Sequence, residues 1–202
     1  MAAPAGRPER IGIFGGTFDP VHVGHLVAAL EARQALELDR VLLVVAHDPW
    51  QKSGERVVTP ADDRFAVVEA AVEGVAGLEA SRLEIDRGGP SYTIDTVRQI
   101  AGDRPEAELF LVVGADVAAE LDTWDRFEEL ARAVTLVVVT RGGVQRAPDP
   151  AGFTVVQLSI PLLEISSSDL RTRLAEGRNA AFLIPEPAIR CIHRRGLYAS
   201  GR

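Results

Sequence analysis

Residues 16–25, GTFDPVHVGH, place His22 and His25 one helical turn apart. They directly follow the apolar run 11–14, so they lie where a buried strand would end and a helix would begin. The first turn of such a helix points free N–H groups outward, and imidazole N–H groups are further hydrogen-bond donors. Because both kinds of donor bind anions, the stretch predicts a phosphate-binding site.

Small residues around this turn support the same interpretation. Gly15 and Gly16 let the backbone approach a ligand closely, and Gly24 lies at the start of the predicted helix. Thr17 adds a hydroxyl or an N–H group to the same site. Two common nucleotide-binding patterns do not fit, because the glycines do not match G-x-G-x-x-G and the chain contains no G-x-x-x-x-G-K-[ST].

Two alternative interpretations of the histidines stay open. The stretch could be an ordinary glycine turn that carries them incidentally. Two imidazoles three positions apart on a helix can also share a metal ion, but no third ligand is near His22 and His25 in the sequence. We therefore expect no metal ion that is bound by protein side chains alone.

A second candidate stretch begins with a run of serines near the C-terminal part of the chain. Ser167 and Ser168 belong to this run and are followed by Asp169, a composition typical of a helix start. Arg171 then lies about one turn in, on the side of the free N–H groups. The arrangement predicts a clamp for the β- and γ-phosphates of a nucleotide, and an ordinary capped helix with a surface arginine is the alternative.

The elements that would position these residues alternate along the chain. Short runs rich in Val, Ile and Leu predict buried strands at 10–14, 40–45, 108–113, 134–140 and 153–158. Apolar residues at three- and four-residue spacing predict helices at 24–38, 60–75, 93–100 and 116–131, with two or three more after Ser166. This alternation predicts an α/β fold, a single Rossmann-like, doubly wound parallel sheet with helices on both faces and a helical C-terminal region.

The predicted sheet also indicates where further site residues lie. We expect one domain over residues 10–202, preceded by a frayed tail at 1–9. Ligands of such sheets bind at the carboxyl ends of the strands. Gly114 and Asp116 follow the strand at 108–113, where a carboxylate would bind the ribose hydroxyls of ATP; a helix cap is the alternative role for Asp116.

Composition and charge limit the classes of partner. The chain has 202 residues, 47% of them hydrophobic, and its 22 basic and 29 acidic residues give a net charge of −7. This negative charge disfavours nucleic acid and anionic membranes as partners. The single cysteine, Cys191, excludes an internal disulfide, and no apolar run is long enough to span a membrane. We therefore expect a cytoplasmic protein, with a homo-oligomeric state left open.

Two stretches carry a family resemblance. Residues 15–25, GGTFDPVHVGH, are similar to the first signature of the nucleotidyltransferase superfamily, G-[ST]-F-D-P-x-H-x-G-H, and residues 165–171, ISSSDLR, are similar to its second, I-S-[ST]-[ST]-x-[IL]-R. Three further stretches resemble the bacterial nicotinate mononucleotide adenylyltransferases and extend the resemblance over residues 9–198: 89–96, Gly114 to Trp124, and 182–185 with Leu197 and Tyr198.

The resemblance implies a reaction and its substrates. Members of this family transfer an adenylyl group from ATP to the phosphate of nicotinate mononucleotide, which produces deamido-NAD and pyrophosphate for NAD biosynthesis. Mg²⁺ would be carried with ATP and bound mainly by phosphate oxygens and water. The alternatives are a sibling adenylyltransferase that acts on another phosphate monoester, such as phosphopantetheine, and a non-catalytic nucleotide sensor.

The catalytic residues follow from the charge that such a reaction develops. Transfer spreads negative charge over the phosphate oxygens, so the protein mainly supplies positioning and positive partial charge. His22, His25 and Arg171 would meet this charge. Lys52 would add a cation on a movable loop, although residues 48–51, DPWQ, depart from the P-P-H-K that the family usually has there.

Acceptor binding is assigned by the same resemblance. In the family, the positions that match Thr93 and Trp124 lie around the pyridine ring, which stacks on the aromatic side chain. The ring carboxylate would meet backbone N–H groups. A plain core role is the alternative for Trp124.

Overall fold

The computed structural model describes residues 6–49, 57–141 and 149–199. Its centre is a six-stranded sheet with the strand order β3-β2-β1-β4-β5-β6, in which every neighbouring pair is parallel. This is the strand order of the Rossmann fold. The strands are β1 (Arg10–Gly16), β2 (Arg40–Val45), β3 (Leu78–Ser81), β4 (Glu108–Gly114), β5 (Thr135–Arg141) and β6 (Thr154–Ile160).

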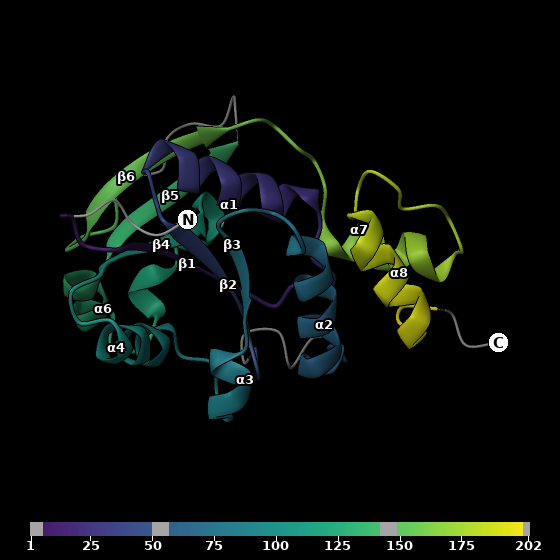
Figure 1. Cartoon of the computed structure of the whole chain (residues 1–202), viewed down its shortest axis with the longest axis horizontal. Helices are drawn as coiled ribbons and strands as arrows, with labels where there is room; N and C mark the ends of the chain where they lie inside the picture. Colours follow the sequence, from purple (N-terminus) through teal and green to yellow (C-terminus); the bar gives the residue numbers. More distant parts are fainter. Residues whose placement is uncertain (1–5, 50–56, 142–148, 200–202) are drawn as a thin grey trace.

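Helices cover both faces of the sheet (Figure 1). Helices α1, α2, α7 and α8 contribute to the apolar core on one face, and α4, α5, η1 and α6 contribute to the core on the other. The predicted doubly wound arrangement is therefore confirmed. The helices are α1 (Val23–Ala35), α2 (Ala61–Val72), α3 (Leu83–Arg87), α4 (Thr93–Asp103), α5 (Ala115–Ala118), the 3₁₀ turn η1 (Leu121–Thr123), α6 (Phe127–Ala133), α7 (Ser167–Ala175) and α8 (Glu186–Arg195).

Strands β1 and β4 are neighbours at the middle of the sheet. The chain continues from β1 to β2 on one side and from β4 to β5 on the other, so the connections diverge between these two strands. Such a switch point leaves a crevice at the carboxyl ends of the strands, where ligands of doubly wound sheets bind. Here the two carboxyl ends are Gly16 and Gly114.

The apolar runs form the strands that their composition predicts. All five predicted strands are present, and β2 has the predicted bounds. In β2 the side chains of Val41, Leu43, Val44 and Val45 are fully buried, because helices or neighbouring chain cover both faces of the strand. Sequence patterning missed β3 and α3, which have four and five residues and are too short to show a period.

The prediction of one continuous helix over 116–131 is wrong. The structure divides this segment into α5, η1 and α6. Trp124 has an extended backbone, with φ −75° and ψ 147°, and Arg126 is left-handed, with φ 50° and ψ 42°. Neither conformation continues a helix, and the break turns the Trp124 side chain toward the pocket described below.

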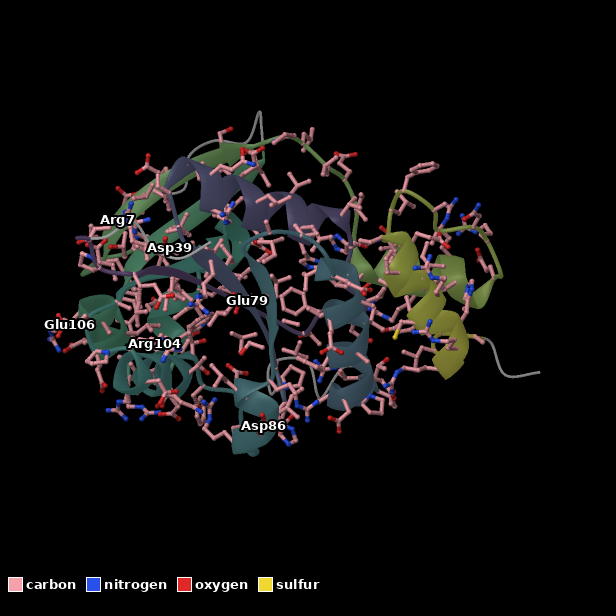
Figure 2. All side chains as sticks on the ribbon, viewed as in Figure 1. Arg7, Asp39, Glu79, Asp86, Arg104 and Glu106 are labelled. Atoms are coloured by element: carbon pink, nitrogen blue, oxygen red, sulfur yellow. The ribbon has the colours of Figure 1, made fainter. Side chains whose placement is uncertain are left out.

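Residues 7–9, which the sequence assigns to a frayed tail, form contacts next to β1. Arg7 forms an ion pair with Asp39 at 2.9 Å (Figure 2), and Glu9 forms one with Arg40. The backbone oxygen of Glu9 also accepts a hydrogen bond from the N–H of Glu108 at 2.8 Å. These contacts hold Arg7 and Glu9 beside the starts of β2 and β4.

The predicted helical C-terminal region consists of α7 and α8. Helix α8 packs along α2, and Arg195 pairs with Asp63 of α2 at 2.5 Å. Figure 1 shows both C-terminal helices, in yellow, beside α2 and the carboxyl end of the sheet. None of the helices in the described ranges is long and apolar enough to cross a membrane.

Candidate functional site

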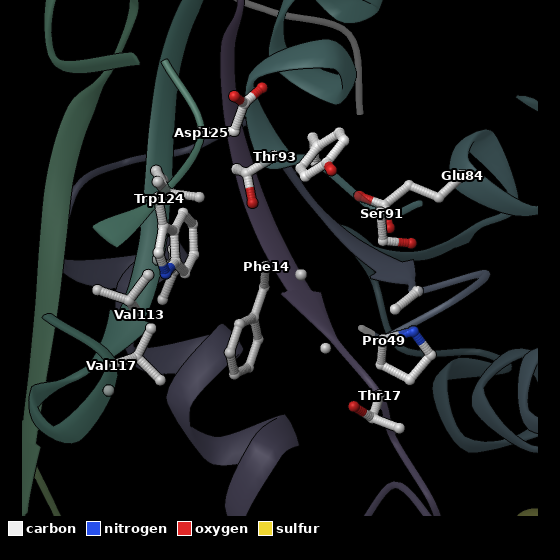
Figure 3. Close-up of a pocket in the computed structure, with 17 residues that line it drawn as sticks. Phe14, Thr17, Pro49, Glu84, Ser91, Thr93, Val113, Val117, Trp124 and Asp125 are labelled. Carbon is white, nitrogen blue, oxygen red and sulfur yellow. The ribbon is translucent and has the colours of Figure 1, made fainter. Parts of the chain in front are cut away.

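A pocket opens at the switch point of the sheet. The end of β1, from Phe14 to Gly16, forms one part of its wall together with Thr17, which directly follows, and the end of β4 at Gly114 forms another. Figure 3 shows Trp124 on one side, Phe14 and Thr93 in the middle, and Pro49, Ser91 and Glu84 on the opposite side. Of the residues predicted to bind substrates, the structure brings together in this pocket Gly15, Gly16, Thr17, Thr93, Gly114 and Trp124.

The glycines of the pocket have different functions. A Cβ at Gly15 would meet no atom within 4 Å, so this position leaves open space for a ligand. A Cβ at Gly16 would lie 2.8 Å from the ring of Phe18, which packs over the backbone there. A Cβ at Gly114 would lie 2.5 Å from Oδ1 of Asp116. Only Gly15 therefore fits the prediction of close approach by a ligand, whereas Gly16 and Gly114 make room for neighbouring side chains.

The two predicted catalytic histidines lie at the start of α1. His22 is the N-cap residue, with extended backbone, and is 5% exposed. The rings of His22 and His25 are stacked, with centroids 3.7 Å apart and planes 29° apart. Gly24 permits this arrangement, because a Cβ there would lie 3.0 Å from Nδ1 of His22. The structure thus places both imidazoles together at the N-terminus of α1, beside the end of β1.

A hydrogen bond determines the tautomer of His25. Its Nδ1 accepts the backbone N–H of His22 at 3.2 Å. A backbone N–H is always a donor, so Nδ1 must be unprotonated and Nε2 must carry the proton. The ring is held from the side by Phe18, whose ring lies edge-on with centroids 5.1 Å apart. His25 therefore presents Nε2–H as a donor for an anion.

The serine-rich stretch that begins at Ser166 docks onto the turn before His22. Ser166 caps α7, since its Oγ accepts the N–H of Asp169 at 3.1 Å. Ser167 donates its hydroxyl to the backbone oxygen of Pro20 at 2.9 Å, and Arg171 donates Nη1–H to the backbone oxygen of Asp19 at 2.8 Å. The start of α7 is thereby fixed against the turn that leads to His22.

The orientation of Arg171 is set from two sides. Besides the bond to Asp19, its Nη2–H donates to Oγ of Ser168 at 3.0 Å. The guanidinium is half-buried rather than free in solvent. The alternative of an ordinary capped helix is correct for the Ser166 cap, but a surface arginine without a defined position is not what the structure shows.

Three predicted site residues require separate description. Asp116 is exposed in the first turn of α5, and the N-cap of that helix is Gly114, so Asp116 is not the cap residue. Trp124 is half-buried, packs against the core on one side of the sheet and also lines the pocket, so its position is compatible with both roles considered for it. Lys52, with its neighbours Trp50 and Gln51, lies outside the described residues.

Sequence reasoning missed a buried cation behind the pocket. Arg64 of α2 is 1% exposed. It donates at 2.7 Å each to the backbone oxygens of Thr17, Ala46 and Thr59, and at 3.3 Å to that of His47. These carbonyls belong to the turn after β1, the exit of β2 and the segment before α2, so one side chain holds three segments of the site. The available signal was an arginine within the apolar stretch 64–68, RFAVV.

A second missed contact involves the C-terminal region. The hydroxyl of Tyr198 donates to Oδ1 of Asp19 at 2.8 Å, and Asp19 is 1% exposed. Burial, the charge of Asp19 and this hydrogen bond raise the pKa of Tyr198 far above its usual value. The phenol is therefore a permanent donor to the signature turn at neutral pH.

The donors at the start of α1 and the neighbouring pocket differ in the groups that they suit. Within the described ranges, no group of three His, Cys, Asp or Glu side chains is arranged to hold a metal ion. Donors at the start of α1, together with an apolar pocket containing an indole, suit a phosphorylated ligand with a flat ring.

Comparison with known proteins decides the family. The cytidylyltransferase-like family model matches residues 13–173. The chain belongs to this family. It is 45% identical over 188 residues to a protein of Frankia alni named "probable nicotinate-nucleotide adenylyltransferase", with 92% of this chain and 98% of that protein covered. A Corynebacterium kroppenstedtii protein of the same name is 42% identical over 192 residues, covering 94% and 90%.

The cytidylyltransferase-like chain also resembles solved structures in its fold. A Plasmodium falciparum nicotinic acid mononucleotide adenylyltransferase complexed with NaAD has a TM-score of 0.76 and 19% sequence identity, covering 94% of this chain and 97% of that chain. The structure of a "putative nicotinate-nucleotide adenylyltransferase" of Vibrio parahaemolyticus has a TM-score of 0.69 and 21% sequence identity, covering 96% of this chain and 97% of that chain. These likenesses confirm the Rossmann-like α/β fold, and the curated relatives confirm the family resemblance in the sequence.

Proposed function

We propose that this protein transfers AMP from ATP to the phosphate of nicotinate mononucleotide and releases deamido-NAD and pyrophosphate. One observation carries the proposal: the switch point has two different parts side by side. The His22–His25 donors lie at the start of α1, and the pocket with Trp124 lies on the other side. One part suits the triphosphate and the other a flat ring. The curated relatives with 42–45% identity carry the corresponding name.

The reaction needs no nucleophilic side chain. An oxygen of the acceptor phosphate forms a bond to the α-phosphorus of ATP, while the bond from that phosphorus to the bridging oxygen of the β-phosphate breaks. Negative charge then builds on the leaving pyrophosphate. Nε2–H of His25 is fixed as a donor by the tautomer described above, and His22 is stacked on it, so both would lie where this charge develops.

Arg171 and the start of α7 would bind the β- and γ-phosphates. The two hydrogen bonds to Asp19 and Ser168 hold the guanidinium beside the turn. A guanidinium is a planar fork of N–H donors whose geometry matches phosphate oxygens. Ser167 and Ser168 place the first N–H groups of the helix on the same side.

The remaining assignments follow the same layout. Asp116 and Gly114 at the end of β4 would hold the ribose of ATP. Mg²⁺ carried with ATP would neutralise part of the triphosphate charge, held by phosphate oxygens and water rather than by a cluster of protein carboxylates. Lys52 would add a cation to the developing charge, so Lys52→Ala would lower kcat more than ATP affinity. The cytoplasmic location and a homo-oligomeric state stay predictions.

The test offers the purified protein ATP and Mg²⁺ with one acceptor per reaction and measures pyrophosphate. The acceptors are nicotinate mononucleotide, nicotinamide mononucleotide and phosphopantetheine. We expect the nicotinate form to react best, by tenfold or more, because a neutral amide would leave backbone donors unpaired at about 1–3 kcal/mol each. Release with phosphopantetheine alone would favour a sibling transferase. ATP binding without release in any reaction would favour a nucleotide sensor.

A further inference from the structure

A buried carboxylate lines the pocket opposite Trp124. Glu84 of α3 is 6% exposed and belongs to the pocket wall, together with Ser91 and Thr93. Figure 3 shows Glu84 and Ser91 on the side away from the indole. A carboxylate is rarely this buried unless it is paired, so its partners indicate its role.

The carboxylate of Glu84 is oriented from behind by one oxygen. Its Oε1 accepts the hydroxyl hydrogen of Thr96 at 2.7 Å, and Thr96 is 1% exposed. The hydroxyl oxygen of Thr96 in turn accepts Nη2–H of Arg87 at 3.1 Å. This chain of two hydrogen bonds fixes the plane of the carboxylate without forming an ion pair to Glu84.

The second oxygen has no such partner. Among the residues that the structure describes, none donates a hydrogen bond to Oε2, and no Lys, Arg or His forms an ion pair with Glu84. A carboxylate oxygen of a mostly buried side chain that lacks a protein donor gains from a ligand that supplies one. The pocket therefore contains an acceptor that is prepared for a hydroxyl, an amine or a cation.

Ser91 provides the complementary donor. Its Oγ accepts the backbone N–H of His47 at 2.9 Å, so its own hydroxyl hydrogen must point elsewhere. Each hydroxyl of a ribose both donates and accepts. A pair of neighbouring hydroxyls therefore matches an unpaired carboxylate oxygen beside a serine hydroxyl better than a single donor or a cation does.

We propose that Glu84, assisted by Ser91, binds the ribose hydroxyls of the acceptor nucleotide and so selects a ribonucleotide acceptor. The inference rests on the proposed function, which places the ring at Trp124 and the ATP ribose at Asp116. The flexible chain of phosphopantetheine has no vicinal diol to match this carboxylate and serine. Glu84 thus adds a selection step that is separate from stacking on the indole.

The experiment combines enzyme variants with substrate analogues. Wild type and Glu84→Gln are assayed with ATP and nicotinate mononucleotide or its 2′-deoxy and 3′-deoxy forms, following pyrophosphate. Gln keeps an oxygen for Thr96 but loses the charge. Asp86→Asn is the matched control, since Asp86 is an exposed carboxylate on the same helix (Figure 2).

We expect Glu84→Gln to lower kcat/KM for the full acceptor by about tenfold or more, the scale of a hydrogen bond to a charged group. Wild type should lose as much with at least one deoxy analogue. The variant should lose less than about threefold further with that analogue, because the interaction is already absent. Asp86→Asn should behave as wild type, and the KM for ATP should not change in any variant.

Several outcomes would overturn the inference. Additive losses from the variant and the analogue would show that Glu84 acts on the pocket without touching the ribose. Coupling to 2′- or 3′-deoxy ATP instead would place Glu84 at the other nucleotide. If Glu84→Gln does not fold, the test uses wild type alone. A loss of kcat/KM below about threefold with both deoxy analogues would then reject the contact between Glu84 and the ribose. Failure of wild type to use nicotinate mononucleotide would reject the proposed function itself.

Discussion

The hydroxyl of Tyr198 lies 2.8 Å from Oδ1 of Asp19, across 179 residues of sequence. Asp19 belongs to the turn that leads to His22, and Arg171 donates to its backbone oxygen. The C-terminal region therefore fixes this turn at a side chain and at the backbone. Tyr198 lies beyond residue 173, where the match to the family model ends, so the geometry of the site depends on residues outside the matched core.

Removal of this hydroxyl should weaken the turn. Tyr198→Phe keeps the ring but deletes a donor to a buried carboxylate. We expect the free energy of unfolding to fall by about 1–3 kcal/mol at pH 7, measured by urea denaturation. Tyr92→Phe is the control, because its hydroxyl makes no hydrogen bond within the described ranges. A change below about 0.5 kcal/mol for Tyr198→Phe would show that the contact does not stabilise the fold.

The same pair predicts an alkaline dependence of stability. Burial, the charge of Asp19 and the hydrogen bond to it raise the pKa of Tyr198 in the folded protein above the value of about 10 in the unfolded chain. The stabilisation is fully present below pH 10 and is lost as the pH rises further, by up to about 1.4 kcal/mol per pH unit. The difference between wild type and Tyr198→Phe should therefore shrink between pH 10 and 11. A constant difference over this range would contradict the assignment.

Arg64 is predicted to be the most sensitive position behind the pocket. Arg64→Met fills the apolar part of the space but leaves four backbone oxygens without their donor. We expect a loss of about 3 kcal/mol or more in the free energy of unfolding. Arg98→Met is the matched control, because Arg98 is exposed and its pair with Glu129 is worth less than about 1 kcal/mol. Equal losses in the two variants would show that the hydrogen bonds of Arg64 stabilise the fold no more than an exposed ion pair does.

The sequence predicted the strands and helices with a clear apolar pattern better than it predicted the contacts between them. The run 40–45 gave β2 with its observed bounds, since a buried strand of a parallel sheet is apolar on both faces. The break at Trp124 was missed because the helical pattern continues through it, whereas the tertiary structure requires the indole at the pocket. Arg64 and Tyr198 were missed for another reason: their partners are backbone oxygens or residues distant in sequence, which no local pattern shows.

The histidines allow a direct test of the phosphate site. His25→Ala removes a donor whose tautomer is fixed by the backbone of His22, and His22→Ala removes its stacked partner. We expect either change to lower kcat by about 10² or more, the scale for losing a donor to transition-state charge. Folding of His25→Ala, followed by thermal denaturation, should be retained. His193→Ala, an exposed histidine on α8, should keep full turnover. High turnover in His25→Ala would reject the catalytic assignment.

Trp124 is expected to separate acceptor binding from ATP binding. Its indole lines the pocket on the side of β4, whereas the proposed triphosphate contacts are at α1 and α7. Trp124→Ala removes the stacking surface, which is worth on the order of 1 kcal/mol beyond the area it buries. We expect the KM for nicotinate mononucleotide to rise by about tenfold, while the KM for ATP stays within about twofold, in steady-state assays of pyrophosphate release. Trp124→Phe should recover most of the affinity because it keeps an aromatic face. Since Trp124 also packs against the core, thermal denaturation distinguishes the two roles: a destabilised Trp124→Ala with an unchanged acceptor KM would leave only the structural one.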